Sequence, residues 1–171
     1  PFFFAQLSSI DRPSWGDFRN AQRLLEKGIK GTYMAVTLDV GDSLDVHPRE
    51  KITIGQRLAN LVQEHLYNVE LNADHPDPVS CTLHEDKLVL IFEHCKKLKT
   101  QENTAVRGFQ LMDNKGRIFN VSTNIVSDNT IEIVKPNFQI TKILYGFEPF
   151  SRANLQNEIG TPVSTFALTI Q

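Results

Sequence analysis

The sequence of 171 residues has few of the features that would assign it to a specialised class. It has only two cysteines, Cys81 and Cys95, which are too few to hold a fold together by disulfides, so we predict free thiols. No apolar run approaches the roughly 20 residues that a membrane-spanning helix needs, so we expect no membrane partner. Eighteen basic and twenty acidic side chains leave a formal charge of −2, and we expect no nucleic acid partner.

Spacings typical of metal ligands are also missing. His65, His75, His84 and His94 have no partner at such a spacing, nor do the two cysteines combine with them into a zinc pattern. We therefore predict structural or surface roles for these four histidines. The sequence predicts neither a metal nor a cofactor.

The first part of the chain alternates between strand and helix patterns. Phe2 to Leu7 and Tyr33 to Leu38 are short, almost wholly apolar runs, typical of internal parallel strands buried on both faces. Helical spacing follows each run, first after Ser14 and then from about Glu50 to Leu66. The order strand, helix, strand, loop, helix is that of an open parallel α/β sheet, whose ligands bind at the carboxyl ends of the strands.

The first predicted helix is amphipathic, with Trp15, Phe18, Gln22 and Leu25 on one stripe. Ser14 is the expected N-cap and Gly28 the expected stop. We predict that this stripe and the neighbouring Phe residues lie in the core rather than forming a platform for a sugar ring.

After a Pro- and Asp-containing linker at residues 72–78, the pattern changes to short alternating strands, which suggests a small antiparallel sandwich or barrel. The fold class predicted is thus α/β followed by all-β, with residues 1–72 as the α/β part and residues 73–171 as the antiparallel β domain. We expect the C-terminal tail to be irregular and to pack back over the α/β part. The strand candidates are Val79 to Leu83, Lys87 to Glu93, Val106 to Met112, Arg117 to Val121, Thr130 to Val134 and Thr141 to Phe147.

Two buried parallel strands cannot complete a sheet by themselves, because their outer edges would stay unpaired. We therefore expect the sheet to require strands that this sequence does not contain. This is a physical indication of a truncated α/β unit.

Asp45-Val46-His47-Pro48 is the strongest candidate for chemistry, since it lies in the loop after a buried strand and before a helix. In an extended stretch, residues two apart project to one side, so Asp45 could accept a hydrogen bond from the ring of His47. That bond would fix the imidazole tautomer while the other nitrogen takes a proton from a serine. Pro48 restricts His47 to extended geometry.

The chain resembles the sialate O-acetylesterase family, within the wider SGNH hydrolase group. The most specific block is Asp-x-His-Pro-x-x-Lys-x-x-x-Gly-x-Arg-Leu-Ala, which runs from Asp45 to Ala59. The remaining matches are the opening strand Pro1 to Leu7; Trp15, Arg19, Ala21 and Gln22; Met34 to Thr37; Gly108-Phe109; Asn154 to Asn157; and Gly160-Thr-Pro162.

This resemblance implies a serine esterase that removes acetyl groups from O-acetylated carbohydrate such as sialic acid or acetylated xylan. His47 would be the general base and Asp45 its orienting carboxylate; many SGNH enzymes have Asp-x-x-His, but position 44 is Leu. The family's nucleophile lies in an upstream Gly-Gln-Ser-Asn segment, which is absent here. The chain would thus be the C-terminal portion, inactive alone, with the missing N-terminal portion as its partner. A periplasmic, secreted or lysosomal location is also implied.

Two other interpretations remain open. The absent nucleophile and the β-rich half are compatible with a non-catalytic glycan-binding or accessory module. Gly41-Asp42-Ser43-Leu44 matches the nucleophile signature of another SGNH branch, but Ser43 lies only four residues before His47, and a tight chain reversal would be needed to join them. A polar turn is the simpler interpretation of that motif.

Overall fold

The structure is a computed structural model that describes residues 1–170. It is mostly β, with antiparallel sheets and two α-helices, α1 (Trp15–Gly28) and α2 (Lys51–Tyr67). Two short 3₁₀ turns, η1 (Leu38–Val40) and η2 (Gln101–Asn103), complete the helical segments of these residues.

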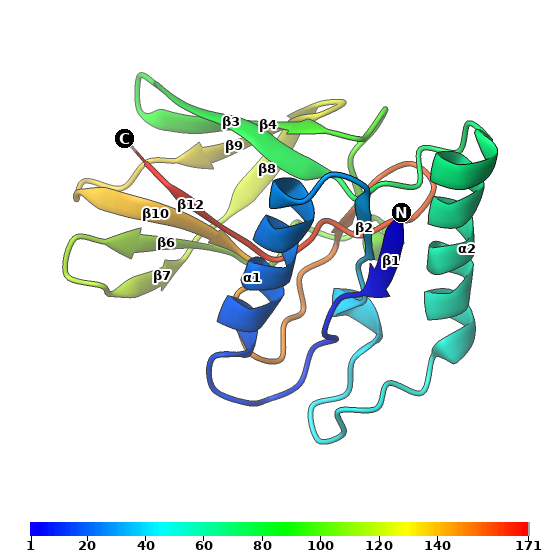
Figure 1. The fold of residues 1–171 in the computed structure, drawn as a ribbon. Helices are drawn as coiled ribbons and strands as arrows, with labels where there is room; N and C mark the ends of the chain where they lie inside the picture. The colour runs from blue at the N-terminus through cyan, green and yellow to red at the C-terminus, as the bar shows by residue number, and fades with distance from the viewer. Residues whose placement is uncertain (171) are drawn as a thin grey trace.

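The N-terminal strands form a small parallel sheet. β1 (Phe2–Ala5) pairs with β2 (Thr32–Ala35), and α1 follows β1 while α2 follows β2 (Figure 1). Both helices contact this pair, and α1 also contacts the C-terminal strand β12 (Phe166–Thr169).

β1 is parallel, as predicted, but it is not buried on both faces. Phe2 and Ala5 are exposed, and within residues 1–170 only one edge of β1 is paired. The internal position of β1 therefore stays a prediction, because it requires a second neighbouring strand that residues 1–170 do not supply.

The rest of the chain forms two four-stranded antiparallel sheets that lie above one another in Figure 1. One has the order β3-β4-β9-β8 and the other the order β12-β10-β6-β7, while β5 and β11 form a separate short pair. The bounds are β3 (Asp77–His84), β4 (Lys87–Glu93), β5 (Lys99–Thr100), β6 (Phe109–Asp113), β7 (Ile118–Asn120), β8 (Thr123–Ser127), β9 (Thr130–Val134), β10 (Ile140–Tyr145) and β11 (Leu155–Gln156).

The main core lies between these two sheets, and its largest members are aromatic. Phe92 from one sheet meets Phe166 from the other, and Phe109 and Tyr145 pack beside Phe166. Met34 at the end of the parallel pair joins the same cluster. The main core thus contains residues from both sides of the predicted boundary between residues 1–72 and 73–171. The division itself stays a prediction.

α1 turns inward a face that only partly overlaps the predicted stripe, since Trp15 and Gln22 are half-buried. Its buried side chains include Arg19 and Arg23, whereas Phe18 and Leu25 are 54% and 48% exposed. The guanidinium of Arg19 donates hydrogen bonds to Thr165 Oγ1 and to the backbone oxygens of residues 146, 148 and 149, at 2.6 to 3.0 Å. These partners make burial of an arginine favourable. The predicted core role is wrong for Phe18 and Leu25, whereas Trp15 is half-buried.

The N-cap prediction is also corrected. Ser14 precedes the helix, but it has a left-handed backbone (φ 63°) and its side chain makes no capping hydrogen bond.

Among residues 1–170, no helix is both long and apolar enough to cross a membrane.

Candidate active-site loop and neighbouring pockets

The loop that carries Asp45 and His47 leaves the carboxyl end of β2 and is fixed at its start. Gly41 lies against the chain that follows β1, where a Cβ would stand 2.1 Å from the backbone oxygen of Ser9. Asp11 N also donates to Ser43 O at 3.2 Å. The loop is therefore packed beside the carboxyl ends of both parallel strands, where open α/β sheets bind their ligands.

A half-buried ion pair braces the same edge from α2. Arg57 donates two hydrogen bonds to the carboxylate of Asp39, both at 2.7 Å, and a third to Val36 O at 2.8 Å. Such a bidentate pair fixes both side chains in one geometry. It holds the end of β2 against the helix that follows the loop.

Asp45 and His47 are in contact. The distance from His47 Nδ1 to Asp45 Oδ1 is 3.2 Å, and the backbone N–H of His47 donates to the same oxygen at 2.9 Å. This arrangement is an Asx-type turn with a bend at His47, so the contact arises from a local turn and not from the extended stretch that was predicted.

Both side chains of this pair are open to solvent. The imidazole of His47 is 82% exposed and the carboxylate of Asp45 is 48% exposed. The backbone N–H of His47 is the main cause that lowers the pKa of Asp45 below its ordinary value, with the hydrogen bond and charge of the imidazole adding to it. Asp45 is thus held as the anion that would accept a hydrogen bond from Nδ1–H, and Nε2 is left free for another group.

Ser43 lies in the same loop but is not joined to His47 by a hydrogen bond within the part of the chain that the structure describes. Its backbone oxygen accepts from Asp11, and the neighbouring Asp42 accepts from Leu44 N at 2.9 Å. The loop around Ser43 is thus a polar turn in this structure.

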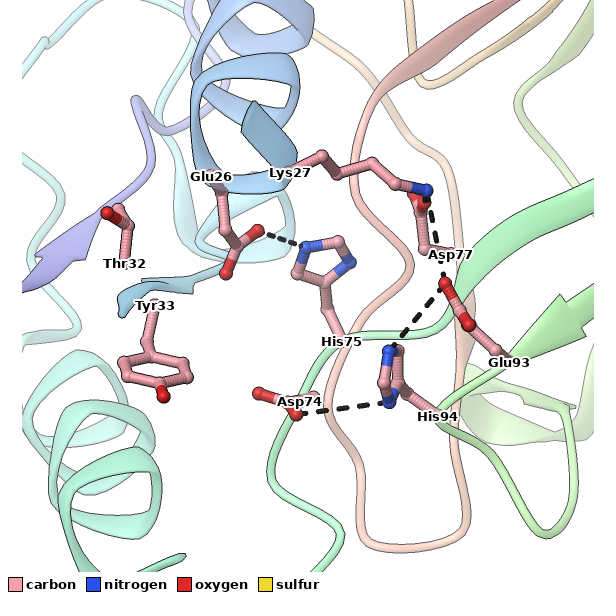
Figure 2. Close-up of a pocket in the computed structure, with 9 residues that line it drawn as sticks. All are labelled: Glu26, Lys27, Thr32, Tyr33, Asp74, His75, Asp77, Glu93 and His94. Atoms are coloured by element: carbon pink, nitrogen blue, oxygen red, sulfur yellow. Dashed lines mark hydrogen bonds and ion pairs between the residues drawn. The ribbon is translucent and has the colours of Figure 1, made fainter. Parts of the chain in front are cut away.

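A pocket lies at the opposite end of the parallel strands, beside the first residues of β2. It has a volume of about 180 Å³ and is lined by ionisable side chains, with His75 at its centre (Figure 2). The lining residues are Glu26, Lys27, Thr32, Tyr33, Asp74, His75, Asp77, Glu93 and His94.

The side chains of this pocket are largely paired with one another. His75 Nε2 contacts Glu26 Oε2 at 2.8 Å, and Asp77 is held by Arg23 and Lys27. Burial alone would lower the pKa of His75, but the hydrogen bond and charge of Glu26, together with Asp77, raise it above its ordinary value. These pairs join the end of α1 to the start of β3, which is a structural role.

Sequence reasoning did not find the partners of the remaining histidines. His65 stacks on Tyr33 at 3.8 Å and contacts Asp74 at 2.8 Å, while His94 lies 3.9 Å from the same carboxylate. Glu26 and His75 are 49 positions apart, so no local spacing could reveal that pair. Within residues 1–170, no group of three or more His, Cys, Asp or Glu side chains is arranged to hold a metal ion.

Two further hollows lie near the carboxyl end of β2. One has a volume of about 380 Å³ and includes Asp39 and Phe150, and the other has about 290 Å³ and includes Asn120 and Glu148. Both are lined by the exposed side chains of Arg107 and Arg152. His47 and Asp45 do not line the five hollows described for residues 1–170.

Comparison with known proteins gives one informative similarity. No protein-family model and no curated protein matches the sequence. The chain is similar to the crystal structure of a carbohydrate acetylesterase from Xanthomonas citri, with a TM-score of 0.86 and 26% identity. The chain has a carbohydrate acetylesterase-like fold. The match covers 98% of this chain but only 40% of that protein, so the chain spans about two fifths of the length of the solved relative.

Proposed function

We propose that the chain is the C-terminal part of a serine carbohydrate O-acetylesterase of the sialate O-acetylesterase type, in which His47 is the general base. The contact between His47 Nδ1 and Asp45 Oδ1 carries this proposal, because it reproduces the base and carboxylate of a serine hydrolase. The similarity to a carbohydrate acetylesterase supports the reaction and the class of substrate. O-acetylated sugars, including sialic acid, are the proposed substrates.

The proposed chemistry follows from the free ring nitrogen. Nε2 of His47 removes the proton of a serine hydroxyl as its oxygen attacks the acetyl carbonyl, and the imidazolium then returns the proton to the departing sugar oxygen. Water, deprotonated by the same nitrogen, hydrolyses the acetyl-serine and releases acetate. Asp45 holds the tautomer and stabilises the imidazolium in both steps.

The proposal requires a serine that these 171 residues do not provide in the expected motif. Two surfaces of the chain support the proposal that a further polypeptide, which carries this serine, binds here. The outer edge of β1 is unpaired within residues 1–170, and the apolar residues Phe18 and Leu25 of α1 are exposed. A further parallel strand would pair with the edge, and the helix connected to it would cover the stripe. We propose that polypeptide of the SGNH α/β sheet, carrying the Gly-Gln-Ser-Asn segment, occupies this place.

This partner would also explain the exposure of His47. Closing the sheet would bring the serine and the oxyanion-hole donors to the carboxyl ends of the strands, and would cover a histidine that is 82% exposed in this chain. Residues 1–72 are then the end of the α/β domain, and residues 73–171 an antiparallel domain packed beside it.

The test is acetate release from O-acetylated sialic acid and acetylated xylooligosaccharides by this chain together with a polypeptide that contains the serine segment. His47→Ala should lower the rate at least a thousandfold. His84→Ala removes an exposed histidine at the end of β3 and should leave the rate unchanged. Acetate release that survives His47→Ala would contradict the assignment. Glycan binding with no release by the wild-type assembly would favour the accessory module instead.

A further inference from the structure

The two hollows beside the carboxyl end of β2 share a pair of exposed arginines. Arg107 and Arg152 each line both hollows, so their side chains stand at the boundary between the two. No hydrogen bond or ion pair in residues 1–170 occupies either guanidinium. An arginine pair without an anion is a ready binding site for a carboxylate, because each guanidinium presents a planar fork of donors.

The acidic side chains of these hollows do not neutralise the pair. Asp39 is engaged by the bidentate contact of Arg57 and also accepts a hydrogen bond from Gln101 Nε2 at 3.3 Å. Glu148 lines only the smaller hollow and accepts from Gln110 Nε2 at 3.3 Å. The hollow that includes Asp39 therefore retains a net positive charge, in a protein whose formal charge is −2.

The backbone presents the two arginines side by side. Gly108 and Ala153, the residues that follow them, are packed so closely that a Cβ on Gly108 would lie 2.5 Å from the Cβ of Ala153. The buried side chain of Asn154 accepts a hydrogen bond from Arg107 N at 2.9 Å and donates to Ala105 O at 2.9 Å. The backbone that carries the two arginines is thus fixed before a ligand arrives, which reduces the entropy lost on binding.

The hollow that includes Asp39 lies near the start of the loop that carries His47 and is separated from it by the segment after β1. Ser9, which packs against Gly41, accepts a hydrogen bond from Ser151 N at 2.7 Å, and Ile10 N donates to Pro149 O at 3.3 Å. The segment after β1 therefore has the loop on one side and residues 149–151 on the other. A sugar bound next to the loop could extend its substituents into the hollow that includes Asp39.

The chemistry of the lining fits a sugar that bears a carboxylate. Besides the two guanidinium groups, the hollow that includes Asp39 offers the amide of Gln101 for sugar hydroxyls and the ring of Phe150 for the apolar face of a sugar. We propose that Arg107 and Arg152 bind the carboxylate of an acidic sugar unit, either the acetylated unit itself or its neighbour in a glycan. This inference rests on the proposed function for the identity of the ligand as a carbohydrate, but not for the binding site itself.

The test measures binding to this chain by titration calorimetry, with probes matched in shape. Methyl glucuronide and N-acetylneuraminic acid should bind, whereas methyl glucoside and the methyl ester of N-acetylneuraminic acid should bind at least tenfold more weakly. Arg107→Gln and Arg152→Gln should each raise the dissociation constant of the acids about tenfold or more. Lys135→Gln, which removes a cation from a different hollow, is the matched control and should change nothing.

Equal binding of the neutral sugars, unchanged binding by both arginine variants, or equally strong binding of inorganic phosphate would overturn the inference. Because both arginines are exposed, their variants should keep the unfolding midpoint of the wild type. The chain with His47→Ala should bind the acids as well as the wild type does. Failure of the esterase assay therefore leaves this binding measurement intact, and failure of binding leaves the esterase assignment intact.

Discussion

Two of the histidine–carboxylate pairs in the molecule differ in almost every physical respect. His75 and Glu26 come from distant parts of the chain, and their side chains are only 6% and 14% exposed. His47 and Asp45 lie two residues apart in a turn, and the imidazole is 82% exposed. The first pair joins two elements, and both ring nitrogens of His75 have partners, whereas the second joins nothing and leaves one ring nitrogen free. The difference shows that a short contact distance does not identify a catalytic histidine; its freedom to meet a second group does.

The largest expected effect on stability belongs to the buried pair. His75→Ala should lower the free energy of unfolding by about 2–4 kcal/mol, because it leaves the carboxylate of Glu26 without a buried partner and creates a cavity. Urea unfolding followed by circular dichroism measures this. His84→Ala is the control and should change stability by less than about 0.5 kcal/mol. An equally stable His75→Ala variant would show that the pair does not join α1 to the β region.

The pH dependence of stability sharpens the same comparison. The pKa of His75 is raised in the folded protein, so the stability it contributes is fully present below its unfolded pKa of about 6.5 and is lost as pH rises through the folded value. The free energy of unfolding should therefore fall as pH rises from about 6.5 into the alkaline range. In Glu26→Gln this fall should become shallower. A fall of equal size in both proteins would contradict the assignment.

A smaller effect is expected at the exposed carboxylate. Asp45→Asn should lower acetate release by the complete assembly about 10- to 100-fold, since the amide no longer stabilises the imidazolium, while solvent limits the loss. Stability should stay within about 0.5 kcal/mol of the wild type. Asp42→Asn is a matched control, because Asp42 makes a similar turn in the same loop. Equal losses in both variants would indicate a defect of the loop and not of the base.

The smallest effect on folding is expected at the exposed stripe of α1. Phe18→Ser should change the stability of this chain by less than about 0.5 kcal/mol, because the side chain is already 54% exposed. It should nevertheless weaken association with the serine-bearing polypeptide, which a pull-down or light scattering with that polypeptide would show. The matched control is Leu83→Ser, an exposed apolar residue in β3. Association unaffected by Phe18→Ser would place the partner elsewhere.

Local patterns predicted a large part of the fold. β4 and β9 have the predicted bounds, because alternation and flanking turns define such strands within a few residues. β8 (Thr123–Ser127) was missed, since it is short and flanked by polar residues, and so were β5, β11 and β12. The short strands β5 and β11 depend on pairing between distant segments, which one sequence does not show.

In the candidate site, only contacts between residues close together in the sequence were predictable. The contact of Asp45 with His47 follows from spacing, although a turn and not an extended stretch produces it. The inward face of α1 was not predictable, because Arg19 is buried by backbone oxygens more than 125 residues further along the chain. The close approach of the segments that carry Arg107 and Arg152 likewise depends on packing between distant parts of the chain.

Chemical rescue tests the central claim most directly. In the assembly that contains the serine segment, His47→Ala should release acetate at a background rate, and free imidazole added to the buffer should restore part of the rate, because the space left by the missing side chain admits a small base to the serine. His75→Ala should show no such response to imidazole. A His47→Ala rate that is already close to the wild type, or that imidazole leaves unchanged, would contradict the role of His47 as the base.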